Sequence, residues 1–341
     1  MKSFATAAAA VVAVAFLAAS CGGGGGGGQT TSAAESGIKI GLVTDIGQLN
    51  DRGFNHLAYV GLQRAEKELG VTGRVSESNS PADYIPNLSK FAKDGYDLVI
   101  GVGFTEIAAM DAAATRFPKT NFAIVDVSKD DLKHHPKNVL GLLFREQEVG
   151  YLAGYLAGLV EKAAPGKNVI SSVGGQKQPP VDRFIAGYQA GAKKADPGIT
   201  TLNGYSQDFV DQTRCKEVAL QQIDQGSGVV FQVAGGCGLG ALDAARERKV
   251  WGIGVDADQS FLGQHILTSA TKRVDVAVYS AIKSVVDGKF KGGDDVYGLE
   301  RDGVGLGKIS PKVPKADVEA VEKIRKDIIS GKIKDIPTVV P

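Results

Sequence analysis

Residues 38–69 read IKIGLVTDIGQLNDRGFNHLAYVGLQRAEKEL. The first part, 38–44, is a short apolar run with β-branched residues, which is typical of a buried strand. The second part has apolar residues three or four positions apart, the pattern of one face of an amphipathic helix. These residues are Phe54, Leu57, Ala58, Gly61, Leu62, Ala65 and Leu69. The stretch therefore predicts a strand, a turn and a helix in succession.

The same alternation continues along the chain. Further apolar, β-rich runs occur at 97–102, 121–126, 168–173, 229–233, 250–255 and 266–270, with helical patterns between them. A repeated strand and helix order implies right-handed crossovers and a doubly wound parallel sheet. Because there are more units than one sheet comfortably holds, we predict an α/β protein with two doubly wound parallel-sheet lobes.

The composition is that of a folded protein with balanced charge. Of 341 residues, 43% are hydrophobic and 23% are charged, and 39 Lys and Arg nearly cancel 38 Asp and Glu. Neither sign forms a long block, so the sequence offers no basic surface for phosphates. We therefore expect no nucleic-acid partner.

The N-terminus carries an export signal. Residues 1–20 combine Lys2 with a run of Ala, Val, Phe and Leu, as a signal peptide does. The segment 17–21 resembles the lipobox of bacterial lipoproteins, which implies an acylated Cys21 at the start of the mature chain. Residues 21–37, rich in glycine, then form a flexible tether. A retained transmembrane helix is the alternative, but we expect a lipid-anchored protein on the extracytoplasmic face of the cell membrane, attached to the membrane through the lipid alone.

Export changes how the two remaining cysteines are interpreted. Outside the cytoplasm, Cys215 and Cys237 are candidates for a disulfide. The alternative is two separately buried thiols, and a Cα separation within about 7 Å distinguishes the two.

Glycines 150, 154 and 158 repeat every four residues within 149–160, as in membrane helices that dimerise. The apolar stretch is too short to cross a bilayer. We predict a helix outside the membrane whose glycine stripe packs closely on the sheet.

Candidate binding residues gather after the predicted strands of both halves, where open α/β sheets bind ligands. They are Asp45, Asn50, Phe54, Asn55, Phe104, Asp126, Phe184, Gly235, Asp256 and Lys272. The recurrence of carboxylates, aromatic rings and glycine turns at equivalent sites predicts a ligand held between two lobes. The motifs of metalloproteases, α/β-hydrolases and P-loop proteins are missing, as is a C-x-x-C pair, so we expect no enzyme activity, no metal and no cofactor.

These residues carry a resemblance to a known family. The segments 45–55, 101–104, 144–154, 184–188, 235–240 and 254–256 resemble the basic membrane protein family of bacterial lipoproteins, which includes solute-binding proteins of the purine nucleoside receptor type. The resemblance implies a type I periplasmic-binding-protein fold with a multi-crossover hinge. It also implies delivery of nucleosides, purines in particular, to the permease and ATPase of an ABC importer. We expect the protein to be a monomer.

The resemblance further implies a role for individual residues. Phe54 and Phe184 would lie on the two faces of the base, with Asn55 and Asp126 at its polar edge. At the ribose it implies Gly235, Asp256 and Lys272, and Lys272 would keep Asp256 charged. A signalling lipoprotein of the same fold and a binder of another polar ligand, such as a sugar, remain open alternatives.

Type I topology also implies where the chain changes lobe. We expect one lobe to contain 38–143 plus 267–293 and the other to contain 144–266 plus 294–341.

Overall fold

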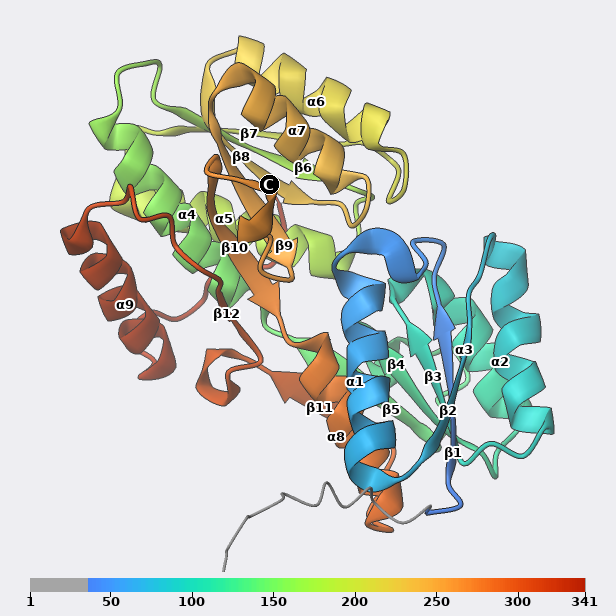
Figure 1. The fold of residues 1–341 in the computed structure, drawn as a ribbon. Helices are drawn as coiled ribbons and strands as arrows, with labels where there is room; N and C mark the ends of the chain where they lie inside the picture. The colour runs from blue at the N-terminus through green and yellow to red at the C-terminus, as the bar shows by residue number, and fades with distance from the viewer. Residues whose placement is uncertain (1–35, 341) are drawn as a thin grey trace, which may run out of the picture. The chain divides into compact units, whose positions relative to one another are not determined.

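The computed structural model describes residues 36–340 (Figure 1). The first sheet has six parallel strands in the order β11-β5-β4-β3-β1-β2. Their bounds are β1 Lys39–Thr44, β2 Thr72–Ser76, β3 Leu98–Val102, β4 Asn121–Val125, β5 Val139–Phe144 and β11 Gly293–Tyr297. Helices α1 (Phe54–Leu69) and α8 (Val274–Val286) pack against each other, and so do α2 (Tyr84–Lys93) and α3 (Ile107–Arg116). This body is the first lobe.

The second lobe repeats the arrangement. Its sheet has the order β12-β10-β9-β8-β6-β7, with β12 antiparallel to β10 and the other pairs parallel. The bounds are β6 Val169–Gly174, β7 Thr200–Tyr205, β8 Ser227–Val233, β9 Trp251–Asp256, β10 Ile266–Lys272 and β12 Val304–Leu306. The helices are α4 Glu146–Ala163, α5 Pro179–Ala195, α6 Gln212–Asp224, α7 Gly238–Arg248 and α9 Lys315–Ile329, of which α9 packs on α4.

The central strands explain why the apolar runs were visible in the sequence. All of β3 and β6 is buried, and β1, β4 and β9 are buried apart from the first residue of each. On α1, Ala58, Gly61, Leu62 and Ala65 are buried, as the spacing predicts. The two-sheet α/β architecture is therefore confirmed. The edge strands β2 and β7 are mostly exposed or half-buried, so they lack a continuous apolar run.

The expected change of lobe after residue 266 is wrong. Strand β10 pairs with β9 and β12 in the second sheet, so residues 267–272 stay in the second lobe. The chain returns to the first lobe at Arg273, where α8 begins to pack on α1, and it stays there through β11 to Tyr297. The expected change of lobe after residue 293 is therefore wrong as well, because β11 pairs with β5. The apolar run of β10 predicts a strand but carries no information about which sheet pairs with it. That choice is made by the strand edges that β10 bonds to, β9 on one side and β12 on the other.

The segments that join the lobes are bonded to one another. Arg145, between β5 and α4, donates its backbone N–H to the carbonyl of Tyr297 at 3.0 Å. Arg273, between β10 and α8, donates its N–H to Gly303 at 2.8 Å. The chain passes between lobes near residues 145, 273 and 298, which makes three connections.

The prediction that the glycine stripe of α4 packs on the sheet is wrong, because the stripe packs on helix α5. A Cβ on Gly150 would lie 2.3 Å from the carbonyl oxygen of Phe184 on α5, and one on Gly154 only 1.9 Å from that of Tyr188. Helix α5 also contributes a glycine to this contact. A Cβ on Gly191 would lie 2.0 Å from the Tyr151 carbonyl oxygen. The stripe thus serves close helix pairing. Within residues 36–340, none of the helices combines the length and apolar character that a membrane span requires.

Candidate ligand-binding site

A cavity opens at the carboxyl ends of the strands of both sheets. The first lobe contributes Asp45, Gly47, Asp51, Phe54, Asn55, Gly103, Phe104, Thr105 and Asp126. The second contributes Gln178, Pro180, Val181, Phe184, Phe209, Val233, Gly235, Gly236, Val255, Asp256 and Lys272. The cavity is therefore built by both lobes.

Two aspartates hold corresponding positions in the two sheets. Asp126 follows β4 and Asp256 ends β9, and each strand is third from the β11 or β12 edge of its sheet. Both residues adopt left-handed backbone conformations, with φ of 71° and 62°. Such conformations are uncommon for residues other than glycine and cluster at functional sites. The backbone thus turns at the cavity in the same way in both lobes.

Lys272 links the two lobes at the cavity. Its Nζ donates to both carboxylate oxygens of Asp126, at 2.9 and 2.8 Å, and to Glu146 Oε1 at 3.3 Å. Arg183 donates to the other oxygen of Glu146 at 3.2 Å. All of Lys272, Asp126 and Glu146 are at most 5% exposed. A buried ion pair of this kind is costly to break from one side.

The charge of Lys272 is maintained by its surroundings. Burial alone would lower the pKa of Lys272, but the carboxylates of Asp126, Glu146 and Asp256 raise it above its ordinary value. The ammonium group also lies 4.9 Å from the ring centre of Phe54 and 5.6 Å from that of Phe184, within range of cation–π attraction. Lys272 is therefore a fixed cation between aromatic rings.

The turn after β1 is ordered by a network around Asn55. The Asn55 side-chain nitrogen donates to Asp45 Oδ1 at 2.7 Å and to Asp51 Oδ2 at 3.1 Å. Its oxygen accepts from the backbone N–H of Asp45 at 3.3 Å. Burial raises the pKa of Asp45 to about 6, against the opposing hydrogen bond from Asn55. Both amide hydrogens of Asn55 are thus engaged within the protein.

Asp51 stabilises the start of α1. Its carboxylate accepts backbone N–H bonds from Gly53 at 2.9 Å, Asn55 at 2.7 Å and His56 at 3.2 Å. These donors have no partner within the helix, and a negative charge is favourable at that end of a helix. The network holds Phe54, the first residue of α1, at the cavity wall.

Asp256 differs from the other carboxylates of the cavity. It is 8% exposed, and its side chain makes no hydrogen bond to any residue that the structure describes. Burial raises the pKa of Asp256 to about 7, although Lys272 opposes the shift. Lys272 does favour the charged form of Asp256, as expected, but burial outweighs it, and the Lys272 ammonium forms its ion pairs with Asp126 and Glu146. Asp256 is left as an acceptor that faces the cavity.

The aromatic residues of the cavity differ in how much ring they offer. Phe184 is only 2% exposed and packs edge-on against Phe231 with ring centres 6.2 Å apart. Phe54, Phe104 and Phe209 are half-buried and line the same cavity. Sequence analysis did not select Phe209, because the strand before its loop, β7, is an edge strand without a continuous apolar run. Its exposed neighbour Val210 gives no apolar pattern either.

Nine of the ten predicted ligand residues line this cavity, and Asn50 does not. Asn50 lies in a short 3-10 helix, Leu49–Asp51, and its side chain is exposed. The position follows β1 closely in sequence, but the turn directs the neighbouring Asp51 inward. Within the described part of the chain, no cluster of three or more His, Cys, Asp or Glu side chains could hold a metal ion.

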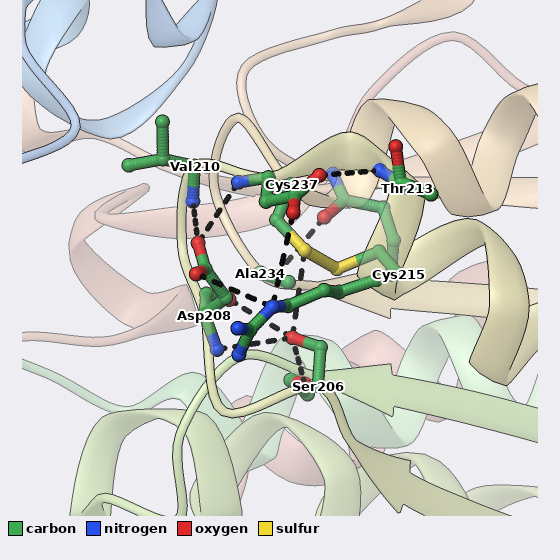
Figure 2. Close-up of a disulfide and its surroundings, with 11 residues drawn as sticks. Ser206, Asp208, Val210, Thr213, Cys215, Ala234 and Cys237 are labelled. Carbon is green, nitrogen blue, oxygen red and sulfur yellow. Dashed lines mark hydrogen bonds and ion pairs between the residues drawn. A yellow bond between two sulfur atoms is a disulfide. The ribbon is translucent and has the colours of Figure 1, made fainter.

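The predicted disulfide is present. Cys215 on α6 is bonded to Cys237 at the start of α7, with Cα atoms 5.6 Å apart (Figure 2). Cys237 follows Gly235 and Gly236, two glycines of the cavity wall. The proposed acylation site, Cys21, lies outside the described residues.

Two sheets that share a cavity at their strand ends define a solute-binding protein of the type I periplasmic fold. A crystal structure of an ABC transporter solute-binding protein from Aeropyrum pernix has a TM-score of 0.80 and 31% identity to this chain, covering 88% of it and 94% of that protein. The chain belongs to the PnrA-like family of ABC transporter substrate-binding proteins, Bmp, whose model matches residues 38–337.

Relatives at similar identity have been named. The ABC transporter nucleoside-binding protein BmpA of Lactococcus lactis is 38% identical over 323 residues, which cover 88% of this chain and 89% of that protein. A lipoprotein of Pyrococcus horikoshii is 34% identical over 328 residues, covering 88% and 80%. The expected family is thereby confirmed, and its members bind solutes for ABC transport and are not enzymes.

Proposed function

We propose that this protein captures nucleosides, purine nucleosides in particular, between its two lobes and delivers them to the permease and ATPase of an ABC importer. The observation that carries the proposal is Asp256, a buried carboxyl group that faces the cavity without a hydrogen-bond partner among residues 36–340. Aromatic rings line the same cavity. The name of the Lactococcus relative, a nucleoside-binding protein, supports the same ligand class.

Asp256 fits the ribose. A carboxylate accepts hydrogen bonds from two neighbouring hydroxyls, each worth about 1.5–3 kcal/mol net because one partner is charged. The turn at Gly235 and the cation of Lys272 lie in the same cavity and complete this end of the proposed site.

Two rings fit the base. Phe54 lies at the start of α1 in the first lobe, and in the second lobe both Phe184 and Phe209 line the cavity. A ring that stacks on a base must present a face, and Phe209 is half-buried while Phe184 is 2% exposed. We therefore favour Phe209 over Phe184 as the ring opposite Phe54. Stacking on a base contributes about 1–3 kcal/mol.

Asp126 has limited capacity to accept further hydrogen bonds from the polar edge of the base. Both of its oxygens accept from Lys272, which belongs to the other lobe. The ion pair therefore contributes to closure of the lobes around the ligand. Closure shields the ligand hydrogen bonds from water and creates the form that a permease recognises.

We further propose that the protein is a monomer attached to the extracytoplasmic side of the membrane through an acylated Cys21. The sequence around Cys21 supports this, as does the lipoprotein name of the Pyrococcus relative. Mass spectrometry of the mature N-terminus tests it, because an unmodified Cys21 in membrane-purified protein contradicts the anchor.

Isothermal titration calorimetry tests the ligand. Residues 38–341, freed of carried-over ligand, are titrated with inosine, guanosine, adenosine, uridine, ribose and hypoxanthine. We expect one-to-one binding of nucleosides, with ribose and the free base far weaker. The absence of measurable binding for every nucleoside, or tighter binding of ribose than of nucleosides, overturns the proposal.

A matched pair of variants links binding to the site. Asp256→Ala should weaken nucleoside binding at least about 100-fold, since two charge-assisted hydrogen bonds are lost. Asp258→Ala, two residues further on and exposed, is the control. Affinity within a few-fold of wild type for Asp256→Ala removes the ribose role.

A further inference from the structure

The disulfide lies beside the cavity, between two loops of the second lobe. One loop, 206–211, joins β7 to α6 and carries Phe209; the other, 234–237, joins β8 to α7 and carries Gly235 and Gly236. Cys215 lies one turn into α6, and Cys237 ends the second loop. Both cysteines are buried. The covalent bond therefore joins the two elements that follow these loops.

The loops are bonded to each other directly beside the disulfide. The backbone N–H of Cys237 donates to the carbonyl of Phe209 at 2.9 Å. Cys237 Sγ lies 3.4 Å from Ser206 Oγ, and that hydroxyl donates to the carbonyl of Asp208 at 2.9 Å (Figure 2). Cys237 therefore contacts this loop at two places, at Ser206 where the loop begins and at Phe209.

The two loops approach each other to van der Waals distance. A Cβ on Gly235 would lie 3.4 Å from the Phe209 carbonyl oxygen, and one on Gly236 would lie 3.5 Å from the same atom. The Phe209 ring itself rests on Gly175, where a Cβ would lie 2.3 Å from the ring. The Phe209 ring thus lies against the end of β6, and the Phe209 backbone carbonyl lies against the 234–237 loop that contains Cys237.

The rest of the Phe209 loop has short-range restraints only. Asp208 Oδ1 accepts from the backbone N–H groups of Val210 at 2.6 Å and Asp211 at 2.8 Å, which closes the loop on itself. Val210 is half exposed, and Phe209 belongs to no helix or strand. Besides the contacts with Gly174 and Gly175 and the ion pairs of Arg214 on α6 with Asp208 and Asp211, the connection through Cys237 ties this loop to its lobe.

We propose that the Cys215–Cys237 disulfide is a positioning element of the ligand site, which holds Phe209 in place before the ligand arrives. The ligand itself rests on the function proposed above. A ring that is already ordered loses less conformational freedom on binding, so the affinity is higher. The role is specific to the second lobe, because Phe54 of the first lobe is held by the Asp51 and Asn55 network and not by the disulfide.

A double-mutant cycle measures this coupling. The disulfide is removed in Cys215→Ala/Cys237→Ala and, as a second variant, in Cys215→Ser/Cys237→Ser. Nucleoside affinity is measured with and without Phe209→Ala in each background. In the wild-type background Phe209→Ala should weaken binding roughly tenfold or more. Without the disulfide we expect the same substitution to cost less than about threefold, since the ring is no longer held in place.

Phe54→Ala is the matched control in the same cycle. Its cost should be equal with and without the disulfide, because the Phe54 network does not contact either cysteine. A general loss of stability would change both costs alike. Equal costs of Phe209→Ala in the two backgrounds, with nucleoside binding intact, overturn the positioning role and leave the proposed function standing.

Hydrogen exchange provides a test that needs no ligand. In the disulfide-free variants, amides in 206–211 and 234–240 should exchange at least about tenfold faster, while those in 44–55 keep the wild-type rate. Unchanged exchange in the two loops overturns the inference even if the wild-type protein binds no nucleoside. Failure of the wild type to bind any nucleoside counts only against the proposed function.

Discussion

Replacing Asp256 by Asn is expected to stabilise the ligand-free protein near neutral pH while weakening ligand binding. Asp256 is buried at the cavity with no hydrogen-bond partner among the described residues, and the carboxylates of Asp126, Asp51 and Glu146 add repulsion. Asparagine has nearly the same shape and carries no charge. The substitution therefore removes an electrostatic cost that the native site bears for the sake of its ligand.

The magnitude follows from the pKa of this group. Burial, against the attraction of Lys272, raises the pKa of Asp256 from 3.8 to about 7. Between these values the folded protein binds more protons than the unfolded chain, so this contribution to stability is fully present below pH 3.8 and is lost as the pH rises through about 7. At about 1.36 kcal/mol for each pH unit, the loss is roughly 2 kcal/mol at pH 5 and roughly 4 kcal/mol at pH 8.

Equilibrium urea unfolding of ligand-free wild type and Asp256→Asn, at about pH 5 and about pH 8, measures the difference. We expect the variant to be more stable by about 2–4 kcal/mol near pH 8, and by half of that or less near pH 5. Asp258→Asn, at an exposed position just after β9, should show no such pH-dependent gain. A variant that is less stable than wild type near pH 8, or a gain that is equal at both pH values, would refute the reasoning.

Three further predictions concern the same framework. Lys272→Met leaves buried carboxylates without their cation and should lower the free energy of unfolding by about 3–5 kcal/mol. Adding Asp126→Asn should restore part of this loss, and no recovery in the double variant contradicts the ion-pair account. Gly154→Ala should destabilise the protein by about 1–3 kcal/mol in thermal unfolding, because its Cβ would lie 1.9 Å from the Tyr188 carbonyl oxygen. Alanine normally favours a helix, so a gain in stability would speak against this helix contact. If nucleoside hydroxyls donate to ionised Asp256, the nucleoside affinity should fall by up to about tenfold for each pH unit below about 7. Calorimetry in that range should show proton release on binding, and an affinity that does not change with pH contradicts this hydrogen bond.

The features that could be predicted are those that depend on local sequence. Strands buried on both faces, such as 121–125, require a continuous apolar run, and α1 requires its apolar face, so both are visible without the structure. Residues that directly follow such strands, such as Asp126 and Asp256, can be assigned to one edge of a sheet by topology alone. For this reason the cavity residues from the strand ends were found.

The features that were wrong or missing depend on partners distant in sequence. The glycines of α4 indicate a close approach, but only the position of α5 shows that a helix lies there. Phe209 lies on an irregular loop, and its place at the cavity follows from the packing of that loop on Gly175 and Cys237. No periodic pattern marks such a residue.

The sequence by itself determined the two-lobed α/β class, the family, the cysteine pair as a candidate and most residues of the cavity, since these follow from local patterns and motifs. Only the tertiary structure decided that β10 belongs to the second sheet and that Lys272 pairs with Asp126 and Glu146. The same holds for Asp256, which is left without a partner. Each of these depends on which charged groups and strand edges, more than a hundred residues apart in several cases, share one buried volume. Burial and charge pairing are properties of that volume, and no single segment of the chain encodes them.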